Sequence, residues 1–418
     1  MPQPTVDNAI EHLGGPVAGR PTPAAAPAPA PRTPEMVGQP ITFRPVKGNK
    51  HKGNQQALGF RNSRWKTLWL RIKLPLVLAY CRLLNISRPV VVVLTVNSNC
   101  NWNCVYCYGD YPTKGTEKNL STEQLTHLID ELAGMGCCYM LVHGGEALLR
   151  KDIGYIVDYI KTKGIYVCLV TNGQLFPKRI DELRNVDNLT ISLDGRAENN
   201  DRNRGKGAYD FALTAIKLAL KERFKVRVQC TLSKHNKDDI PYLAELSKEI
   251  GVPVSFSILF KTDFSALDDP LALTPEEIKH CLNTIGELKR AGYPLFTSKP
   301  NLDYALHWPY ERFNKLFLMK EDVPADFKPL KCYYGQLKFH IEGDGRVMPC
   351  TILSSNHFNG KDVREVGARE AIRHVRETNR CVACPHLTQN EWNLLMGMSP
   401  QVIAVNATEQ VKELTRWY

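Results

Sequence analysis

Three cysteines lie close together in the segment CNWNCVYC, at Cys100, Cys104 and Cys107. A tetrahedral zinc site needs a fourth ligand, and none follows nearby. A 4Fe-4S cube held by three thiolates keeps one iron open to a further ligand. The spacing therefore favours an open iron-sulfur cluster over a zinc site completed from elsewhere or three unrelated core cysteines.

This segment resembles the CxxxCxΦC signature of the radical S-adenosylmethionine (SAM) superfamily, in which Φ is aromatic, and Tyr106 fills that place. The resemblance implies that the open iron binds the amino and carboxylate groups of SAM. It also implies that an electron, from a carrier such as flavodoxin or ferredoxin, breaks a carbon-sulfur bond of SAM. The products are methionine and a 5′-deoxyadenosyl radical that removes a hydrogen atom from the substrate.

The segment His143-Gly144-Gly145-Glu146-Ala147 follows a predicted strand. Two glycines at a strand end let a ligand approach the backbone closely, and a carboxylate accepts hydrogen bonds from an ammonium group. The segment resembles the superfamily's GGEP motif, which implies that it meets the amino group of SAM. Ala147 stands where that motif has proline, which makes the turn less stiff.

Further polar residues end the next two predicted strands. Thr171 and Asn172 end one, Ser192 ends the other, and both resemble the superfamily's polar strand ends near the ribose of SAM. Arg204, within DRNRGKGAYD, resembles an RG element whose arginine takes the SAM carboxylate as a bidentate partner. Turn chemistry and surface charge are the alternative explanation for these residues.

Four more cysteines form two pairs, Cys332 with Cys350 and Cys381 with Cys384. Residues 337–341 and 346–348 flank a Glu-Gly-Asp-Gly turn, which predicts a β-hairpin that brings the first pair together. Four thiolates in two pairs suit either structural zinc or a fully ligated iron-sulfur cluster, and spacing does not separate the two.

The two pairs resemble a twitch domain, a truncated SPASM domain that carries one auxiliary 4Fe-4S cluster. A complete SPASM domain needs three further cysteines, and none follows Cys384. The resemblance implies that all four cysteines ligate one cluster. Such a cluster has no open iron, so we expect it to transfer electrons, for instance from a substrate radical; zinc is the alternative.

From residue 89, short apolar runs alternate with amphipathic stretches, as in parallel strands joined by helices. The expected fold class is α/β, a partial (β/α)6 radical SAM barrel followed by a small α+β auxiliary-cluster domain. Ligands should bind at the carboxyl ends of the strands. The strands are expected at 90–96, 139–143, 166–171, 189–194, 226–232 and 254–260. The helices are expected at 122–134, with a capping box from Ser121, and at 152–163, 178–185, 208–222, 238–250 and 275–291.

Excess positive charge is confined to the N-terminal part. Residues 41–88 contain eleven Lys and Arg and no Asp or Glu, which accounts for the net charge of +11. Residues 1–41, rich in Pro and Ala, predict a disordered leader. Residues 42–88 predict a basic amphipathic extension whose helix Pro75 should kink or interrupt. This helix can cover the barrel, contact a membrane surface through residues 61–88, or bind nucleic acid, in that order of preference.

The remaining boundaries follow from these motifs: a core barrel at 89–265, a bridging helical and aromatic segment at 266–330, the auxiliary domain at 331–386 and a tail at 387–418. No secretory signal begins the sequence, so a cytoplasmic protein is expected, with peripheral contact at the inner membrane face as an addition. The charged residues of the extension are too frequent for a membrane span.

Three functions fit the sequence. The first is a radical SAM oxidoreductase or transferase acting on a small-molecule or lipid-like, membrane-associated substrate. The second is a peptide-modifying radical SAM maturase. The third is a zinc-containing RNA-binding protein, although a nucleic-acid partner is not expected. No residue is identified as the catalytic acid, base or hydrogen donor.

Overall fold

The computed structural model describes residues 64–107, 109, 118–260, 270–310, 317–353 and 358–404. The predicted leader at 1–41 lies outside these residues. So do the first part of the basic extension and the last part of the predicted tail.

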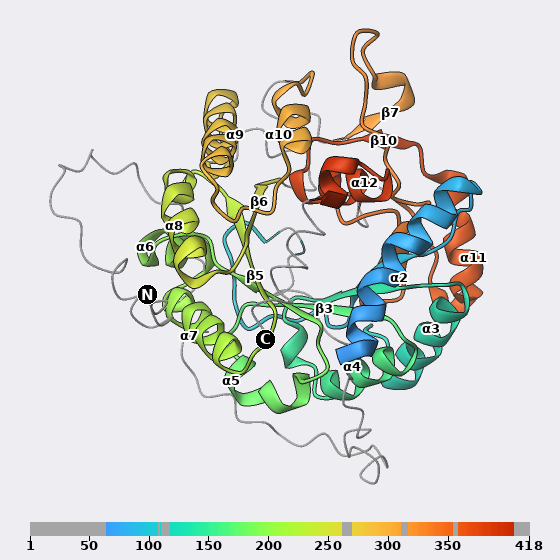
Figure 1. The fold of residues 1–418 in the computed structure, drawn as a ribbon. Helices are drawn as coiled ribbons and strands as arrows, with labels where there is room; N and C mark the ends of the chain where they lie inside the picture. Colours follow the sequence, from blue (N-terminus) through green and yellow to red (C-terminus); the bar gives the residue numbers. More distant parts are fainter. Residues whose placement is uncertain are drawn as a thin grey trace, which may run out of the picture.

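One sheet of eight strands forms the centre of the structure, in the order β6-β5-β4-β3-β2-β1-β8-β9. The six strands from β1 to β6 pair in parallel, and helices surround them on the outside (Figure 1). The expected α/β partial barrel is therefore confirmed. The bounds of the parallel strands are β1 Val91–Thr95, β2 Tyr139–His143, β3 Tyr166–Thr171, β4 Asn188–Ser192, β5 Val226–Leu232 and β6 Val254–Ile258.

Side chains along each strand alternate between a helix-covered outer face and an inner face. On β5, Val226, Val228 and Cys230 join the main hydrophobic core, whereas Arg227 and Gln229 point to the other side. The same alternation on the other strands gives the inner face a mixture of apolar side chains, such as Val93 and Leu141, and polar ones. Its polar residues include Thr95, His143, Asn188, Thr190, Arg227, Gln229, Ser255, Ser257, Lys338 and His340.

The helices between the strands begin and end close to their predicted positions, except for the one expected at 178–185, where the short α5 ends at Arg179 and a 3-10 helix follows at Ile180–Leu183. Ser121 caps α3, and its side chain accepts a hydrogen bond from the Gln124 backbone in the expected capping box. The sequence missed α6, because its residues AENNDRNR have no apolar stripe. The bounds are α3 Thr122–Gly134, α4 Ile153–Thr162, α5 Phe176–Arg179, α6 Ala197–Arg204, α7 Ala208–Lys221, α8 Ile240–Ile250 and α9 Pro275–Arg290.

The predicted hairpin is present as β8 Lys338–Ile341 and β9 Val347–Met348. It continues the main sheet, because β8 pairs in parallel with β1. A second, two-stranded sheet joins β7 Leu318–Met319 to β10 Cys381–Ala383. The remaining helices are α10 Lys299–Leu306, α11 Val363–Thr378 and α12 Leu387–Met396.

Helix α2, Arg64–Leu83, runs along the outside of the molecule (Figure 1, blue). It continues through Pro75, so the proline does not interrupt it. A proline removes one backbone hydrogen bond, and tertiary packing of Leu74 before Pro75 and of Leu78 and Cys81 after it holds the helix in place. No helix within the described ranges is long and apolar enough to cross a membrane.

Candidate functional site

The cysteine loop follows β1 and is tied to its neighbours by backbone hydrogen bonds. The Val105 amide donates to the Asn203 carbonyl at 2.9 Å. Burial raises the pKa of the Cys100 thiol to about 12, and negative charge on Cys104 and Cys107 adds to the rise, so the three thiols lie near one another. A thiolate here requires a cationic partner, a charge that the iron of a bound cluster would supply.

The Gly-Gly turn after β2 packs against this loop. The Gly145 amide donates to the Asn97 carbonyl at 2.9 Å, and the Glu146 amide donates to the Asn99 carbonyl at 2.8 Å. A Cβ atom on Gly144 would lie 2.4 Å from the Asn97 oxygen. Only glycine fits at position 144, because the backbone of the cysteine loop leaves no room there for a Cβ atom.

Glu146 is buried and links the ends of β2 and β3. Its Oε1 accepts from the Leu148 amide at 2.9 Å and the Thr171 hydroxyl at 2.8 Å, and its Oε2 accepts from the Asn172 amide at 2.8 Å. Burial raises the pKa of this carboxyl group, and the three hydrogen bonds oppose the rise. Three of about four lone-pair positions are used, which leaves one on Oε2 for a ligand.

Asn172 connects the end of β3 to the cysteine loop, because its Nδ2 donates to Asn101 Oδ1 at 2.9 Å. Asn101 in turn donates to the Gln174 side chain. The predicted residues Gly144, Gly145, Glu146, Thr171 and Asn172 thus belong to one network with the loop.

Asp194, just past β4, organises the other side of the site. It is fully buried and accepts hydrogen bonds from the Arg204 guanidinium at 2.9 Å, the Thr231 amide at 2.9 Å and the Tyr106 hydroxyl. Arg204 also lies over the Tyr106 ring, 5.7 Å from its centroid. The structure therefore brings Tyr106 and Arg204 together through a carboxylate that the sequence analysis did not select.

Arg204 faces the cluster cysteines. Its positive charge lowers the pKa of Cys104, although burial has the larger effect and raises that pKa to about 11. The Arg204 Nε is buried and has no hydrogen-bond partner within the described residues. Ser192 is the last residue of β4 and is partly exposed, and no described hydrogen bond joins its side chain to this network.

Gly205 explains the RG element. It has φ +122°, and a Cβ atom there would lie 2.8 Å from the Trp102 ring. The tryptophan of the cysteine loop thus packs directly on the glycine that ends α6. The need for glycine at this position comes from Trp102, about 100 residues earlier in the chain, so the sequence around Gly205 does not reveal it.

The four later cysteines line one small hollow of about 10 Å³ together: Cys332, Cys350, Cys381 and Cys384. Burial raises the pKa of the Cys350 thiol to about 12. Across the described ranges, no three His, Cys, Asp or Glu side chains converge as ligands of a single metal ion.

Lys338 is buried beside this hollow. Its Nζ lies 4.8 Å from the Tyr334 ring centroid and 4.5 Å from the Trp392 ring centroid. Burial lowers its pKa to about 7, and the thiols of Cys350, Cys168 and Cys332 act in the opposite direction. The other buried lysine, Lys161, has Asp187 as its partner at 2.5 Å, whereas the groups near Lys338 that can carry negative charge are thiols.

Two histidines on the inner face were not selected from the sequence as site residues. The Thr95 hydroxyl lies 3.2 Å from His143 Nε2 and 3.0 Å from His340 Nε2. Burial and the charge of His340 lower the pKa of His143 to about 3, which keeps its ring neutral. The three side chains come from β1, β2 and β8, so only the non-local pairing of β8 brings them together.

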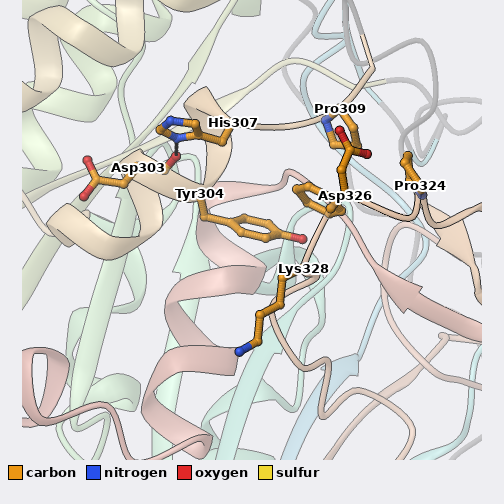
Figure 2. Close-up of a pocket in the computed structure, with 8 residues that line it drawn as sticks. Asp303, Tyr304, His307, Pro309, Pro324, Asp326 and Lys328 are labelled. Carbon is orange, nitrogen blue, oxygen red and sulfur yellow. Dashed lines mark hydrogen bonds between the residues drawn. The ribbon is translucent and has the colours of Figure 1, made fainter.

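A pocket of about 650 Å³ opens beside α10 (Figure 2). Tyr304 and His307 line one side, and Asp326 and Lys328 line another. The Tyr304 ring also packs against a hydrophobic cluster that contains Ala383, the residue before Cys384. The predicted aromatic bridging segment thus contacts the second cysteine group.

The residues present fit the groups that the sequence implies. Three thiols beside an unpaired guanidinium nitrogen and a carboxylate with one unused lone pair suit an amino acid bound to a cluster. Four thiols around one hollow suit a second cluster.

Comparisons with known proteins agree with this arrangement. A family model described as the Radical SAM superfamily matches residues 94–247. Mycofactocin maturase MftC of Mycobacterium tuberculosis is 31% identical, over 72% of this chain and 75% of that protein. An AdoMet-dependent heme synthase of Methanosarcina barkeri is 28% identical, over 72% of this chain and 89% of that protein.

The chain is also similar to a peptide cyclase in sequence and to a solved structure in fold. The PqqA peptide cyclase of Ruegeria pomeroyi is 26% identical, over 72% of this chain and 81% of that protein. The structure of Streptococcus suis SuiB bound to S-adenosylmethionine matches with a TM-score of 0.53 at 15% identity, over 71% of this chain and 70% of that chain. The second match shows a shared fold.

Proposed function

Because the chain belongs to the radical SAM superfamily, we propose that it is a two-cluster enzyme that modifies a peptide. The observation that carries the proposal is the presence of two separate thiol groups, three thiols at the carboxyl ends of the strands and four around one hollow. An open cluster paired with a closed one suits a substrate that is first activated and then oxidised.

The first site binds SAM through its own side chains. Cys100, Cys104 and Cys107 hold the open cluster, which, when loaded and reduced, supplies the electron that cleaves SAM. Arg204 binds the SAM carboxylate through its unpaired Nε, and Glu146 accepts from the SAM ammonium through Oε2. A small electron carrier such as flavodoxin or ferredoxin delivers the electron.

The second site takes electrons. Cys332, Cys350, Cys381 and Cys384 are all used as ligands, so no corner of that cluster binds substrate. A cluster held there would supply an electron acceptor for the oxidation of a substrate radical, which loses one electron to it and one proton to solvent. The inner face of the sheet carries Thr95 and His340 as well as Lys338 near the second cysteine group, and its polar side chains offer hydrogen bonds to a peptide backbone.

A peptide is favoured over the small-molecule or lipid-like substrate that the sequence alone suggested. Relatives over most of this chain include a mycofactocin maturase and a PqqA peptide cyclase. Family membership makes the protein an enzyme, which argues against the zinc-containing RNA-binding alternative.

A second candidate function is the modification of a carboxylate-bearing tetrapyrrole. A heme synthase is similar over nearly its whole length. Arg227 on the inner face stacks on Phe296 at 3.6 Å and has a buried Nε without a hydrogen-bond partner in the described part of the chain, so it offers a binding group for a carboxylate.

The two candidates differ in what stimulates SAM cleavage. Reconstituted full-length enzyme is incubated anaerobically with SAM, a reductant and either a cell-derived peptide fraction or iron-coproporphyrin III, and 5′-deoxyadenosine is measured. We expect the peptide fraction to increase its formation, and protease treatment of that fraction to remove the increase. Stimulation by the porphyrin alone would assign the second function.

A further inference from the structure

A hydrophobic stripe on α2 faces away from the rest of the molecule. Six of the eight large hydrophobic side chains exposed among the described residues lie on α2 or directly after it. They recur every three or four positions, so they share one helix face. They are Trp69, Ile72, Leu76, Tyr80, Leu83 and Leu84, and their exposed fractions run from 43% to 84%.

The opposite face of α2 is already occupied. Leu78 and Cys81 are buried in a cluster with Val90, Tyr333 and other apolar side chains. The ammonium group of Lys73 donates to the Gly164 carbonyl at 3.1 Å, just before β3. The helix is therefore held in one rotation, and turning it inward to bury the stripe would expose Leu78 and Cys81.

These contacts also place α2 relative to the SAM site. Val90 precedes β1, Gly164 precedes β3 and Leu337 precedes β8, so α2 crosses the amino ends of these strands. The cysteine loop lies at the carboxyl ends. A surface that covers the stripe thus leaves the SAM site open.

The positive charge of the sequence around α2 indicates that the stripe binds an anionic surface. Residues 41–88 carry eleven Lys and Arg and no Asp or Glu. Exposed Trp, Tyr and Leu side chains next to a basic segment suit the interface of a bilayer that contains anionic lipid. A second copy of the chain suits the stripe less well, because pairing would bring two equally basic segments together.

We propose that α2 docks the enzyme on an anionic lipid surface, with the stripe at the level of the headgroups. This docking site is independent of which substrate the enzyme modifies. It lies at the end of the sheet opposite the cysteine loop.

Flotation of the full-length protein with vesicles tests the proposal. The probes are vesicles of phosphatidylcholine alone and of phosphatidylcholine mixed with phosphatidylglycerol. We expect the protein to float with the mixed vesicles, to bind the neutral ones at least about tenfold more weakly, and to detach at high salt. Equal binding to both vesicles, or no binding to either, overturns the proposal.

A serine triple variant of the stripe, Trp69→Ser, Leu76→Ser and Leu83→Ser, supplies the decisive comparison. These side chains are exposed, so the variant should keep the wild-type circular dichroism spectrum and iron content. We expect binding to mixed vesicles to fall at least about tenfold. The control is Phe211→Ser, which removes an exposed aromatic ring that lies on α7 and contacts Trp102 of the cysteine loop; whatever its iron content, it should bind vesicles like the wild type.

A stripe variant that binds mixed vesicles as well as the wild type refutes the role of α2. Analytical ultracentrifugation without lipid distinguishes self-association. If the wild type forms a dimer that the stripe variant abolishes, the stripe binds a second copy and the lipid proposal is wrong.

Discussion

Replacing Asp194 with asparagine removes one negative charge from a fully buried position and changes the side-chain volume very little. Its partner Arg204 has a side chain only 11% exposed, so the guanidinium has little access to water when its counter-charge is lost. Breaking one side of a buried ion pair costs about 3–5 kcal/mol. The asparagine oxygen can still accept from Thr231, so we expect the lower end, a loss of about 3 kcal/mol in the free energy of unfolding.

Urea unfolding of the cluster-free protein, followed by circular dichroism, measures this loss. The control is Asp303→Asn, which breaks an ion pair with Lys299 whose side chains are 72% and 49% exposed. That pair should contribute less than about 1 kcal/mol. If Asp194→Asn destabilises the protein no more than the control, Asp194 is not the counter-charge of Arg204 and the description of this network is wrong. The loaded variant should also bind SAM more weakly, because Arg204 and Tyr106 lose their common anchor.

Four further predictions follow from the same structure. Glu146→Gln places an amide N–H against the Asn172 amide, so the free energy of unfolding should fall by about 1–3 kcal/mol in thermal or urea melts. An unchanged value would contradict the three hydrogen bonds described for the Glu146 carboxylate. Cys350→Ala should keep SAM cleavage without substrate turnover, whereas Cys100→Ala should abolish cleavage, both measured as 5′-deoxyadenosine. Lys338→Met should lower the reduction potential of the auxiliary cluster, by about 59 mV for each tenfold change in a one-electron equilibrium. Lys338→Arg should restore that potential. Identical redox titrations of the wild type and both variants would exclude an electrostatic role for Lys338. The pKa of His143 is lowered to about 3, so below the unfolded-state value of about 6.5 the unfolded chain binds the extra proton and stability falls as pH falls. At pH 5 this costs about 2 kcal/mol, and His143→Asn should flatten the stability difference between pH 7 and pH 5 by that amount.

The sequence predicted those features that depend on local pattern. Tyr139–His143, Tyr166–Thr171 and Val226–Leu232 agree with the expected strands at both ends, because each is a run of largely apolar residues bounded by polar or turn residues. The capping box at Ser121 was equally visible, because Ser and Gln three residues apart suffice to define it.

Features that depend on distant partners were missed. Asp194 was not selected as a site residue, because its partners Tyr106, Arg204 and Thr231 come from three other elements. The pairing of β8 with β1 joins segments nearly 250 residues apart, and it is this pairing that brings His340 to Thr95. Gly144 was expected to admit a ligand, whereas the atom that approaches it is the carbonyl oxygen of Asn97.

The central claim is that one chain holds an open SAM-binding cluster and a closed auxiliary cluster. The most direct measurement is iron and acid-labile sulfide per chain on anaerobically reconstituted protein, with electron paramagnetic resonance of the reduced form before and after SAM is added. We expect two 4Fe-4S clusters, of which SAM perturbs the signal of one and leaves the other unchanged, and we expect the perturbed signal to be absent from Cys100→Ala. Zinc without sulfide, or a single cluster that survives in Cys100→Ala, would contradict the account.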